Sequence, residues 1–238
     1  MPLKKQFRHE YKYLITPHEY FVLRARLAPL MHVDKHAKSS EGYHIRSLYF
    51  DDAYDSSLYE KDAGVYRREK FRIRIYDKSN SIIKLERKGK SGNHIDKESS
   101  SLTTKEYYRI LNGNCKFLSQ SEEDPLKKLF FSRMRTNLLK PAIITDYFRE
   151  PFTYPVSEVR VTFDKKISTV AGSLDIFAFD NHVDVPSEVY DMVVLEVKFN
   201  NFLPDIIRDQ LFVGSSAQAV SKYVLCRMAV EQYNLKGC

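Results

Sequence analysis

Basic side chains occupy alternate positions in two neighbouring segments of the chain, KFRIRIY at 70–76 and KLERK at 84–88. In the first segment the two alternating sets are Lys70, Arg72 and Arg74, and Phe71, Ile73 and Ile75. In the second they are Lys84, Glu86 and Lys88, and Ile83 and Leu85. Guanidinium groups grip phosphate oxygens in pairs and ammonium groups add a point charge, so this pattern suits the binding of a phosphate-rich anion.

Alternation at period two predicts strands, and the two segments flank a turn at residues 77–80. We therefore expect a β-hairpin with one apolar face and one cationic face. A single hairpin of this kind is also explained by a half-buried sheet whose charges are solvated, because antiparallel sheets commonly have one wet face.

The same alternation recurs in other expected strands, at 7–14, 142–149, 158–164 and 193–199. Their polar faces carry Arg8, Glu10 and Lys12; Thr145, Tyr147 and Arg149; Arg160, Thr162 and Asp164; and Glu196 and Lys198. Like charges opposite each other on a sheet are destabilising, so an anion should offset them. We expect a closed barrel whose cationic faces point inward, with glutamates able to hold a divalent ion against phosphates.

The remaining segments predict helices around these strands. Thr16, Pro17 and Glu19 form a helix start, and Thr103 with Glu106 forms a capping box. We expect helices at 17–28, 54–59, 103–111, 125–138, 203–212 and 217–233, strands at 43–51 and 94–100, a loop at 31–42 and a turn at 89–93. No internal repeat or linker interrupts the sequence, which predicts a single domain over residues 1–238.

The chain has 238 residues and a formal net charge of +7, which favours an anionic partner. Its three cysteines, Cys115, Cys226 and Cys238, form no CxxC pair and indicate a reducing compartment. We see no signal peptide and no apolar run long enough for a membrane span, so we expect a soluble, cytoplasmic protein. The sequence also lacks the P-loop, the dinucleotide-binding and the HExxH motifs.

Eight short segments together resemble the VTC-type polyphosphate polymerase branch of the triphosphate tunnel metalloenzymes. They are RHEYKYLI at 8–15, SLYFDD at 47–52, KFRIRIY at 70–76, KLERK at 84–88, DYFR at 146–149, VRVTFD at 159–164, LEVKF at 195–199 and SKY at 221–223. The resemblance implies an α+β fold with a closed antiparallel eight-stranded barrel, helices packed around it and a divalent metal, Mn²⁺ or Mg²⁺. It implies transfer of the terminal phosphate of ATP to a growing polyphosphate chain.

The resemblance also implies roles for individual residues. Those expected to bind and transfer phosphate are Lys12, Arg72, Arg74, Lys88, Arg149, Arg160, Lys198 and Lys222. Substrate-binding candidates are Lys97, Tyr147 and Ser221, to which we add Glu10 and Lys84 from the same strand faces. Glu196 matches the metal-binding glutamate, and Glu86 is a second metal candidate for which an ion pair with a neighbouring cation is an equal alternative. Arg8 replaces the first glutamate of the hydrolase motif Glu-x-Glu-x-Lys, which fits the polymerase branch better.

Phosphoryl transfer needs positioning and charge neutralisation more than covalent chemistry. The expected partners are ATP and inorganic polyphosphate, with no nucleic acid; the oligomeric state and association with a separate membrane protein stay open. Two alternatives remain at this point. One is a hydrolase of inorganic triphosphate or nucleoside triphosphates, and the other is a module that binds polyphosphate or RNA without catalysis.

Overall fold

The structure is a computed structural model that describes residues 8–35, 37, 41–59, 66–91, 94–121, 123–180, 182–212, 214, 216–218 and 220–236. The strands are β1 (Arg8–Ile15), β2 (His32–Val33), β3 (Tyr43–Asp51), β4 (Arg67–Tyr76), β5 (Ser79–Ser91), β6 (His94–Leu102), β7 (Lys140–Tyr154), β8 (Val159–Ala171), β9 (Val183–Pro186) and β10 (Val193–Asn200). The helices are α1 (Pro17–Leu27), α2 (Ser56–Tyr59), α3 (Thr104–Leu111), α4 (Lys116–Ser119), α5 (Pro125–Thr136), the short 3₁₀ helix η1 (Val156–Glu158), α6 (Asp205–Arg208) and α7 (Lys222–Lys236).

The strand order confirms an α+β fold with an antiparallel sheet. It runs β1-β10-β8-β7-β3-β4-β5-β6, with β2 beside β7 and β9 beside β8. The expected closure into a barrel would require β1 to pair with β6. The described residues record no such pairing, so closure stays a prediction.

The chain divides into two compact units, which we describe separately. Unit 1 comprises Met1–His44, Tyr147–Ile167 and Pro186–Lys222, and unit 2 comprises Ile45–Asp146, Ser168–Val185 and Tyr223–Cys238. The long strands β7 and β8 contribute residues to both units. Six candidate site residues fall in unit 2, namely Arg72, Arg74, Lys84, Glu86, Lys88 and Lys97, and the others fall in unit 1.

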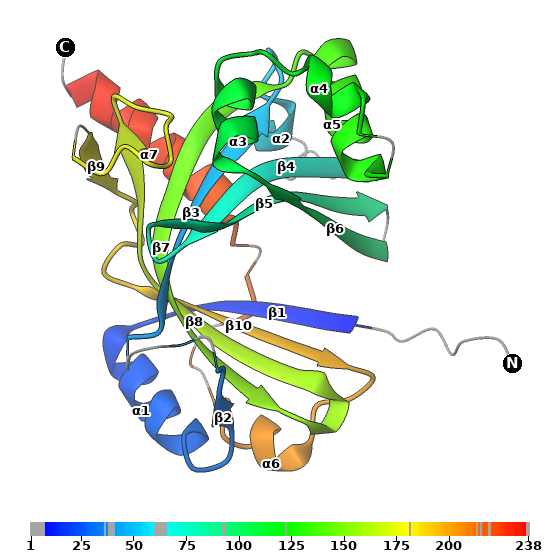
Figure 1. The fold of residues 1–238 in the computed structure, drawn as a ribbon. Coiled ribbons are helices and arrows are strands. Elements are labelled where there is room, and N and C mark those ends of the chain that lie inside the picture. The colour runs from blue at the N-terminus through cyan, green and yellow to red at the C-terminus, as the bar shows by residue number, and fades with distance from the viewer. Residues whose placement is uncertain are drawn as a thin grey trace, which may run out of the picture. The chain divides into compact units, whose positions relative to one another are not determined.

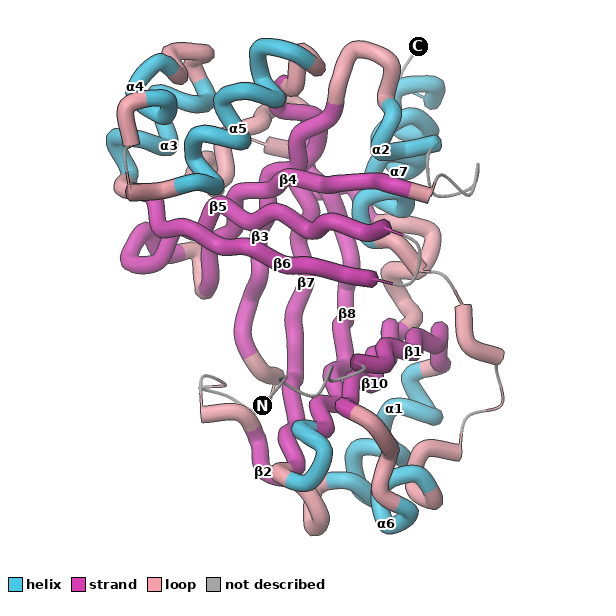
Figure 2. The backbone as a smooth tube through the Cα atoms, turned by 90° about the vertical axis from the view of Figure 1, so that its right-hand side faces the viewer, coloured by secondary structure: helices cyan, strands magenta, loops and turns pink. Residues whose placement is uncertain are grey.

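The central hairpin of unit 2 is made by β4 and β5, which lie side by side with β6 (Figure 2). Its loop is only two residues long, because Tyr76 already pairs with Ser79. Asp77 and Lys78 have φ angles of 50° and 54°, as a type I′ turn requires at both central positions. The turn is therefore shorter than the four residues expected from the sequence.

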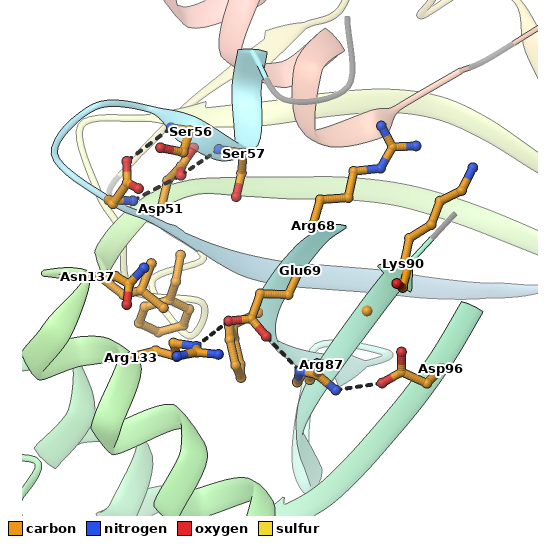
Figure 3. Close-up of a pocket in the computed structure, with 16 residues that line it drawn as sticks. Asp51, Ser56, Ser57, Arg68, Glu69, Arg87, Lys90, Asp96, Arg133 and Asn137 are labelled. Carbon is orange, nitrogen blue, oxygen red and sulfur yellow. Dashed lines mark hydrogen bonds and ion pairs between the residues drawn. The ribbon is translucent and has the colours of Figure 1, made fainter. Parts of the chain in front are cut away.

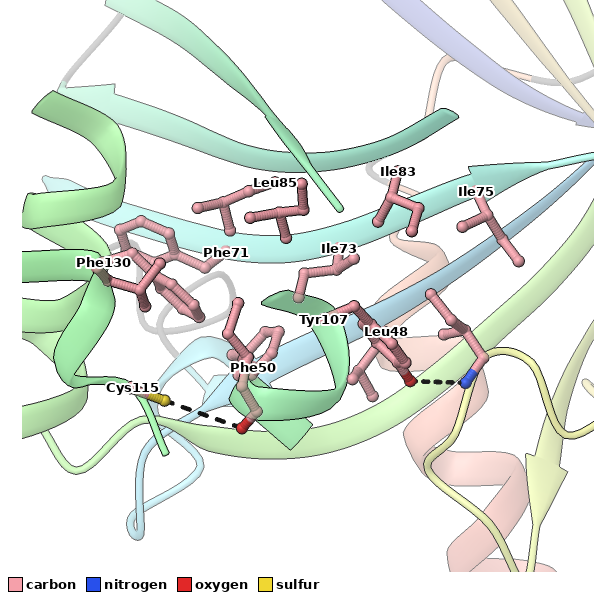
Figure 4. Packing of buried hydrophobic residues seen from close by; sticks show 14 of the residues in the cluster. Leu48, Phe50, Phe71, Ile73, Ile75, Ile83, Leu85, Tyr107, Cys115 and Phe130 are labelled. Carbon is pink, nitrogen blue, oxygen red and sulfur yellow. Dashed lines mark hydrogen bonds between the residues drawn. The ribbon is translucent and has the colours of Figure 1, made fainter. Parts of the chain in front are cut away.

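The core of unit 2 confirms the predicted apolar face of this hairpin (Figure 4). Phe71, Ile73 and Leu85 are at most 2% exposed and pack in one cluster with residues of α3, α4 and α5. The Phe130 ring of α5 packs at a tilt against Phe71, with 5.2 Å between ring centroids. Since successive strand residues point to opposite faces, the basic positions of β4 lie on the face that these helices do not cover.

In unit 1, as in unit 2, the strands bury an apolar face against helices. Strands β1, β10 and β8 of unit 1 pair in register, with α1 beside them (Figure 1). The alternate residues Val161, Phe163 and Leu195 are fully buried in a cluster with apolar residues of α1 and α6. The capping boxes predicted at the starts of α1 and α3 are both present. The polar faces of the unit 1 strands are thus also opposite their helix-covered face.

Two helices are shorter than expected from the sequence. Helix α6 spans only Asp205–Arg208 within the expected 203–212. Beyond it, Leu211 packs partly buried against the unit 1 core, whereas Phe212 is 83% exposed. Helix α7 begins at Lys222 instead of residue 217. Ahead of the helix, the Gln218 amide donates a hydrogen bond to the Lys12 carbonyl of β1 over 2.7 Å.

Several shorter elements were not predicted, namely α4, η1, β2 and β9. Phe7, the expected first residue of β1, and residues 92–93 of the expected turn lie outside the described residues. Cys115 and Cys226 are buried free thiols. No helix in the described part of the chain combines the length and hydropathy that a membrane crossing requires.

Candidate functional site

The unit 2 candidates gather around Glu86, whose side chain is only 5% exposed. Arg72 lies opposite Glu86 on the neighbouring strand, and its Nε and Nη2 both lie 2.7 Å from Oε2. The Lys97 ammonium lies 2.6 Å from Oε1, and Arg74 Nη1 lies 3.8 Å from Oε2. Three predicted phosphate-binding residues therefore converge on one buried carboxylate.

Strand β3 supplies two further partners that the sequence argument did not select. The Tyr49 hydroxyl accepts a hydrogen bond from Arg72 Nη1 over 2.8 Å, and the Ser47 hydroxyl accepts one from Arg74 Nε over 3.1 Å. Register explains both contacts, because Tyr49 lies opposite Arg72 and Ser47 opposite Arg74. The alternation of SLYFDD could have identified these two residues as polar-face neighbours of the hairpin.

Lys84 and Lys88 complete the basic face of β5. Lys84 donates to the Ser101 hydroxyl over 3.1 Å. Lys88 is exposed and lies between Lys70 and Lys97 in the register of β4, β5 and β6. Cross-strand neighbours of like charge repel each other. Lys70, Lys88 and Lys97 therefore form a row of three like charges across these strands.

The charge of Glu86 is fixed by its neighbours. Burial alone would raise the pKa of this carboxyl group, but Arg72, Arg74 and Lys97 outweigh burial and lower the pKa to about 2. Glu86 is therefore ionised at neutral pH and offsets part of the repulsion among the three cations. Its sequence-based assignment as a metal ligand stays a prediction.

Unit 1 contains a compact ladder of two carboxylates and two ammonium groups on β1 and β10. Glu10 lies opposite Lys198, and Lys12 lies opposite Glu196. Lys12 Nζ lies 3.1 Å from Glu10 Oε1 and 3.6 Å from Glu196 Oε2. Lys198 Nζ contacts Glu196 and lies 3.9 Å from Glu10 Oε2. Each ammonium group thus touches both carboxylates.

Burial and neighbouring charges have opposite effects on the pKa values of Glu196 and Lys198 in this ladder. Burial would raise the pKa of Glu196, but Lys198, Arg149, Lys12 and Lys222 outweigh it and hold the pKa well below its ordinary value. For Lys198, burial outweighs the two carboxylates: it lowers the pKa of the ammonium group, although Glu196 and Glu10 would raise it. Glu196 is therefore ionised at neutral pH, and its assignment as a metal ligand stays a prediction.

A second group of unit 1 is organised by Asp164, whose side chain is fully buried. Arg149 grips it with two hydrogen bonds of 2.7 Å, from Nε to Oδ1 and from Nη2 to Oδ2. Lys222 Nζ lies 2.6 Å from Oδ2 and 4.9 Å from the centre of the Tyr147 ring. Asp164 shares the polar face of β8 in VRVTFD, which was the available signal, but it was not among the predicted site residues.

This carboxylate also keeps its two cations charged. Burial would raise the pKa of Asp164, but Arg149 and Lys222 lower it to about 2. For Lys222, burial alone would lower the pKa, but Asp164 and Tyr147 outweigh burial and raise it. Arg149 and Lys222 are thus held in one orientation and one charge state.

The remaining two unit 1 candidates have different surroundings. Arg160 is opposite Lys198 in register, but its Nη2 lies 3.2 Å from both Asp34 Oδ2 and the Tyr43 hydroxyl. Ser221 is half-buried and immediately precedes α7. The structure therefore brings Glu10, Lys12, Glu196 and Lys198 together, and Arg149, Lys222 and Tyr147 together, with Arg160 paired separately.

The donor chemistry of the ladder fits a divalent cation. Magnesium is usually held by one or two carboxylates together with substrate phosphates and waters. Glu10 and Glu196 supply two carboxylates that already share a pair of cations. Within the described residues no group of three or more His, Cys, Asp or Glu side chains is placed to hold a metal, so phosphate oxygens would have to complete the coordination.

Comparison with known families gives the class of this chain. The family model of the VTC domain matches residues 7–230. The chain therefore belongs to the VTC domain family, as the eight sequence segments indicated, and this membership supports a polyphosphate- or triphosphate-related function. No curated protein matches the chain.

Solved structures with similar folds are distant in sequence. The PH1819 protein from Pyrococcus horikoshii OT3 is 13% identical with a TM-score of 0.46, and the match covers 95% of this chain and 99% of that one. HpAC1 from Hippeastrum, a proposed adenylyl cyclase that reveals a dominant triphosphatase activity, is 16% identical with a TM-score of 0.46, covering 87% and 91%. A proposed adenylate cyclase from Bacillus halodurans is 10% identical with a TM-score of 0.44, covering 97% and 90%. These similarities are too low to transfer an activity.

Proposed function

We propose that this protein is a metal-dependent polyphosphate polymerase that transfers the terminal phosphate of ATP to a polyphosphate chain. The observation that carries the proposal is the collection of arginine and lysine side chains on the polar strand faces, held in place by buried carboxylates, in a chain of the VTC family. Pre-positioned cations of this kind stabilise the charge that spreads over a phosphoryl group during transfer.

The unit 2 cluster is suited to holding the triphosphate of ATP. Arg72 and Arg74 are fixed by Glu86, Tyr49 and Ser47, so their guanidinium groups lose little freedom when phosphate binds. Lys88 lies on the same face and is exposed. We assign these residues the role of orienting the phosphates and neutralising their charge.

In unit 1, Glu10 and Glu196 would hold Mn²⁺ or Mg²⁺, which supplies Lewis-acid neutralisation of the phosphate oxygens when bound. Lys12 and Lys198 would then turn from these carboxylates toward phosphate. Arg149 and Lys222 keep their charges through Asp164 and neutralise the phosphoryl oxygens.

The reaction itself requires no general base. The acceptor is the terminal oxygen of a phosphate or polyphosphate, which is already an anion. It forms a new bond to the γ-phosphorus of ATP while the bond from that phosphorus to the β–γ bridging oxygen breaks, and ADP leaves. The closed eight-stranded barrel, with the polar faces of all strands toward one channel, and a cytoplasmic location are further parts of this proposal.

Incubation with ATP and Mn²⁺ or Mg²⁺ tests the proposal, with the products separated into long polyphosphate, ADP and free phosphate. Long polyphosphate with stoichiometric ADP is the expected result. Free phosphate without polyphosphate would instead establish a triphosphate hydrolase. Tight polyphosphate binding with no turnover of ATP under any divalent ion would establish a binding module.

A further inference from the structure

The basic face of the β4–β5 hairpin continues beyond the residues that match the family. Lys70 lies opposite Lys88, and Arg68 lies opposite Lys90, so two successive cross-strand pairs carry like charges only. Such pairs destabilise a sheet unless something else compensates for them. The complete ladder of four cross-strand pairs is Arg74–Lys84, Arg72–Glu86, Lys70–Lys88 and Arg68–Lys90.

The last pair, Arg68–Lys90, is the one that the family segments do not include. Among the described residues, the structure records no hydrogen bond or ion pair for the side chains of Arg68 and Lys90. Both belong to the lining of a cavity of about 460 Å³, and both point away from the ion pairs that join Glu69, Arg87 and Asp96 (Figure 3).

The acidic residues of that cavity are engaged elsewhere. Glu69 and Asp96 both contact Arg87, on the opposite face of the hairpin from Arg68. Asp51 accepts hydrogen bonds from the Ser57 amide and the Tyr223 hydroxyl. Among the described residues, these three carboxylates are therefore not paired with Arg68 or Lys90.

We propose that Arg68 and Lys90 form an additional subsite for a long polyphosphate chain, at the end of the ladder furthest from Arg74. Six residue steps of about 3.4 Å separate Arg68 from Arg74 along β4, so the ladder is about 20 Å long. A triphosphate held at Arg72 and Arg74 is too short to reach its far end. The subsite therefore contacts only chains with many phosphates, and it rests on the proposed binding of phosphate by this hairpin.

A double variant, Arg68→Ala with Lys90→Ala, tests this subsite. The matched control is Lys105→Ala with Lys128→Ala, which removes the same charge from exposed positions on α3 and α5 of the same unit. Affinity for tripolyphosphate and for long-chain polyphosphate is measured in chelator over a series of salt concentrations. Thermal unfolding of each variant shows whether it is folded.

The subsite variant should bind long-chain polyphosphate roughly fivefold more weakly, since the charge contacts of two half-buried side chains are lost. The slope of log affinity against log salt should fall by about 1.4 for the long chain, because two fewer counterions are displaced. Affinity for tripolyphosphate should be unchanged, and the control should leave both ligands unaffected.

Three results would overturn the subsite. One is unchanged long-chain affinity in a folded variant, the second is an equal loss for both ligands, and the third is an equal loss in the control. Each requires that wild-type protein binds both ligands. Failure of the wild type to bind either phosphate would instead reject the proposed function itself.

Discussion

The two units carry the same number of candidate cations but balance them differently. In unit 2, five cations accompany one carboxylate: Arg72, Arg74, Lys84, Lys88 and Lys97 with Glu86. In unit 1, five cations accompany four carboxylates: Lys12, Arg149, Arg160, Lys198 and Lys222 with Glu10, Asp34, Asp164 and Glu196. Among these side chains, the unit 2 cluster therefore has an excess of positive charge, whereas the unit 1 clusters are nearly neutral.

We propose that this difference between the clusters separates two tasks, phosphate capture and metal binding. An excess of cations attracts a polyanion and tolerates ligands of varied length. A nearly neutral ladder of alternating charges repels phosphate less than bare carboxylates would, and it keeps carboxylates available for a divalent ion. We therefore assign phosphate capture mainly to the unit 2 cluster and metal-assisted chemistry to the unit 1 cluster.

The largest expected effect follows from Asp164→Asn in unit 1. This change leaves the buried charges of Arg149 and Lys222 without their carboxylate. Losing one partner of a buried ion pair costs about 3–5 kcal/mol of folding free energy. Urea unfolding of wild type and variant, monitored by circular dichroism, measures the difference.

Asp205→Asn is the control for that experiment. Asp205 pairs with Arg208 over 2.7 Å, but both side chains are more than half exposed. Removing such a pair should change the free energy of unfolding by less than about 1 kcal/mol. Equal effects of the two variants would show that Asp164 does not organise the unit 1 cations.

Acid should weaken unit 2 through Glu86. Its pKa falls from an ordinary value of 4.5 in the unfolded chain to about 2 in the fold. A depressed carboxyl pKa stabilises the fold above the unfolded value, and this stabilisation is lost as the pH falls toward the folded value. The shift corresponds to about 3 kcal/mol.

The measurement compares the free energies of unfolding of wild type and Glu86→Gln at neutral pH and at about pH 2. The advantage of wild type over the variant should shrink by about 3 kcal/mol at the lower pH. A difference between the two proteins that does not change with pH would show that the cations around Glu86 do not hold its charge.

A smaller effect concerns ligand affinity in unit 2. Glu86→Gln removes the single carboxylate among five cations, so affinity for tripolyphosphate in chelator should rise by up to about tenfold. Arg74→Ala should lower the same affinity, because it removes a cation from the cluster. Calorimetric titration with tripolyphosphate in chelator measures the affinity of each variant. Loss of metal-dependent binding in Glu86→Gln would identify Glu86 as a metal ligand, the other assignment made from the sequence.

The strand faces were predictable from the sequence because period-two alternation fixes which side chains share a face. The burial of Phe71, Ile73 and Leu85 followed directly from that rule. The family also followed, since its segments keep their order along almost the whole chain. Both predictions depend on local patterns that are repeated several times.

The ion-pair partners were not predictable to the same extent, because they depend on register between strands far apart in sequence. Lys12 and Glu196 lie near opposite ends of the chain, and their pairing appears only once β1 and β10 are placed side by side. The sequence argument assigned the compensation of repulsion to a bound anion. The structure shows that carboxylates within the chain supply much of it, chiefly in unit 1.

Glu196→Gln tests the division of tasks most directly. The variant removes a carboxylate from the unit 1 ladder and leaves unit 2 intact. Two assays on folded protein are required: product formation from ATP with Mn²⁺, and affinity for polyphosphate in chelator. We predict loss of metal-dependent turnover by at least about 100-fold, with metal-free affinity kept or increased. Near-normal turnover, or a parallel loss of metal-free affinity, would contradict the assignment of metal-assisted chemistry to unit 1.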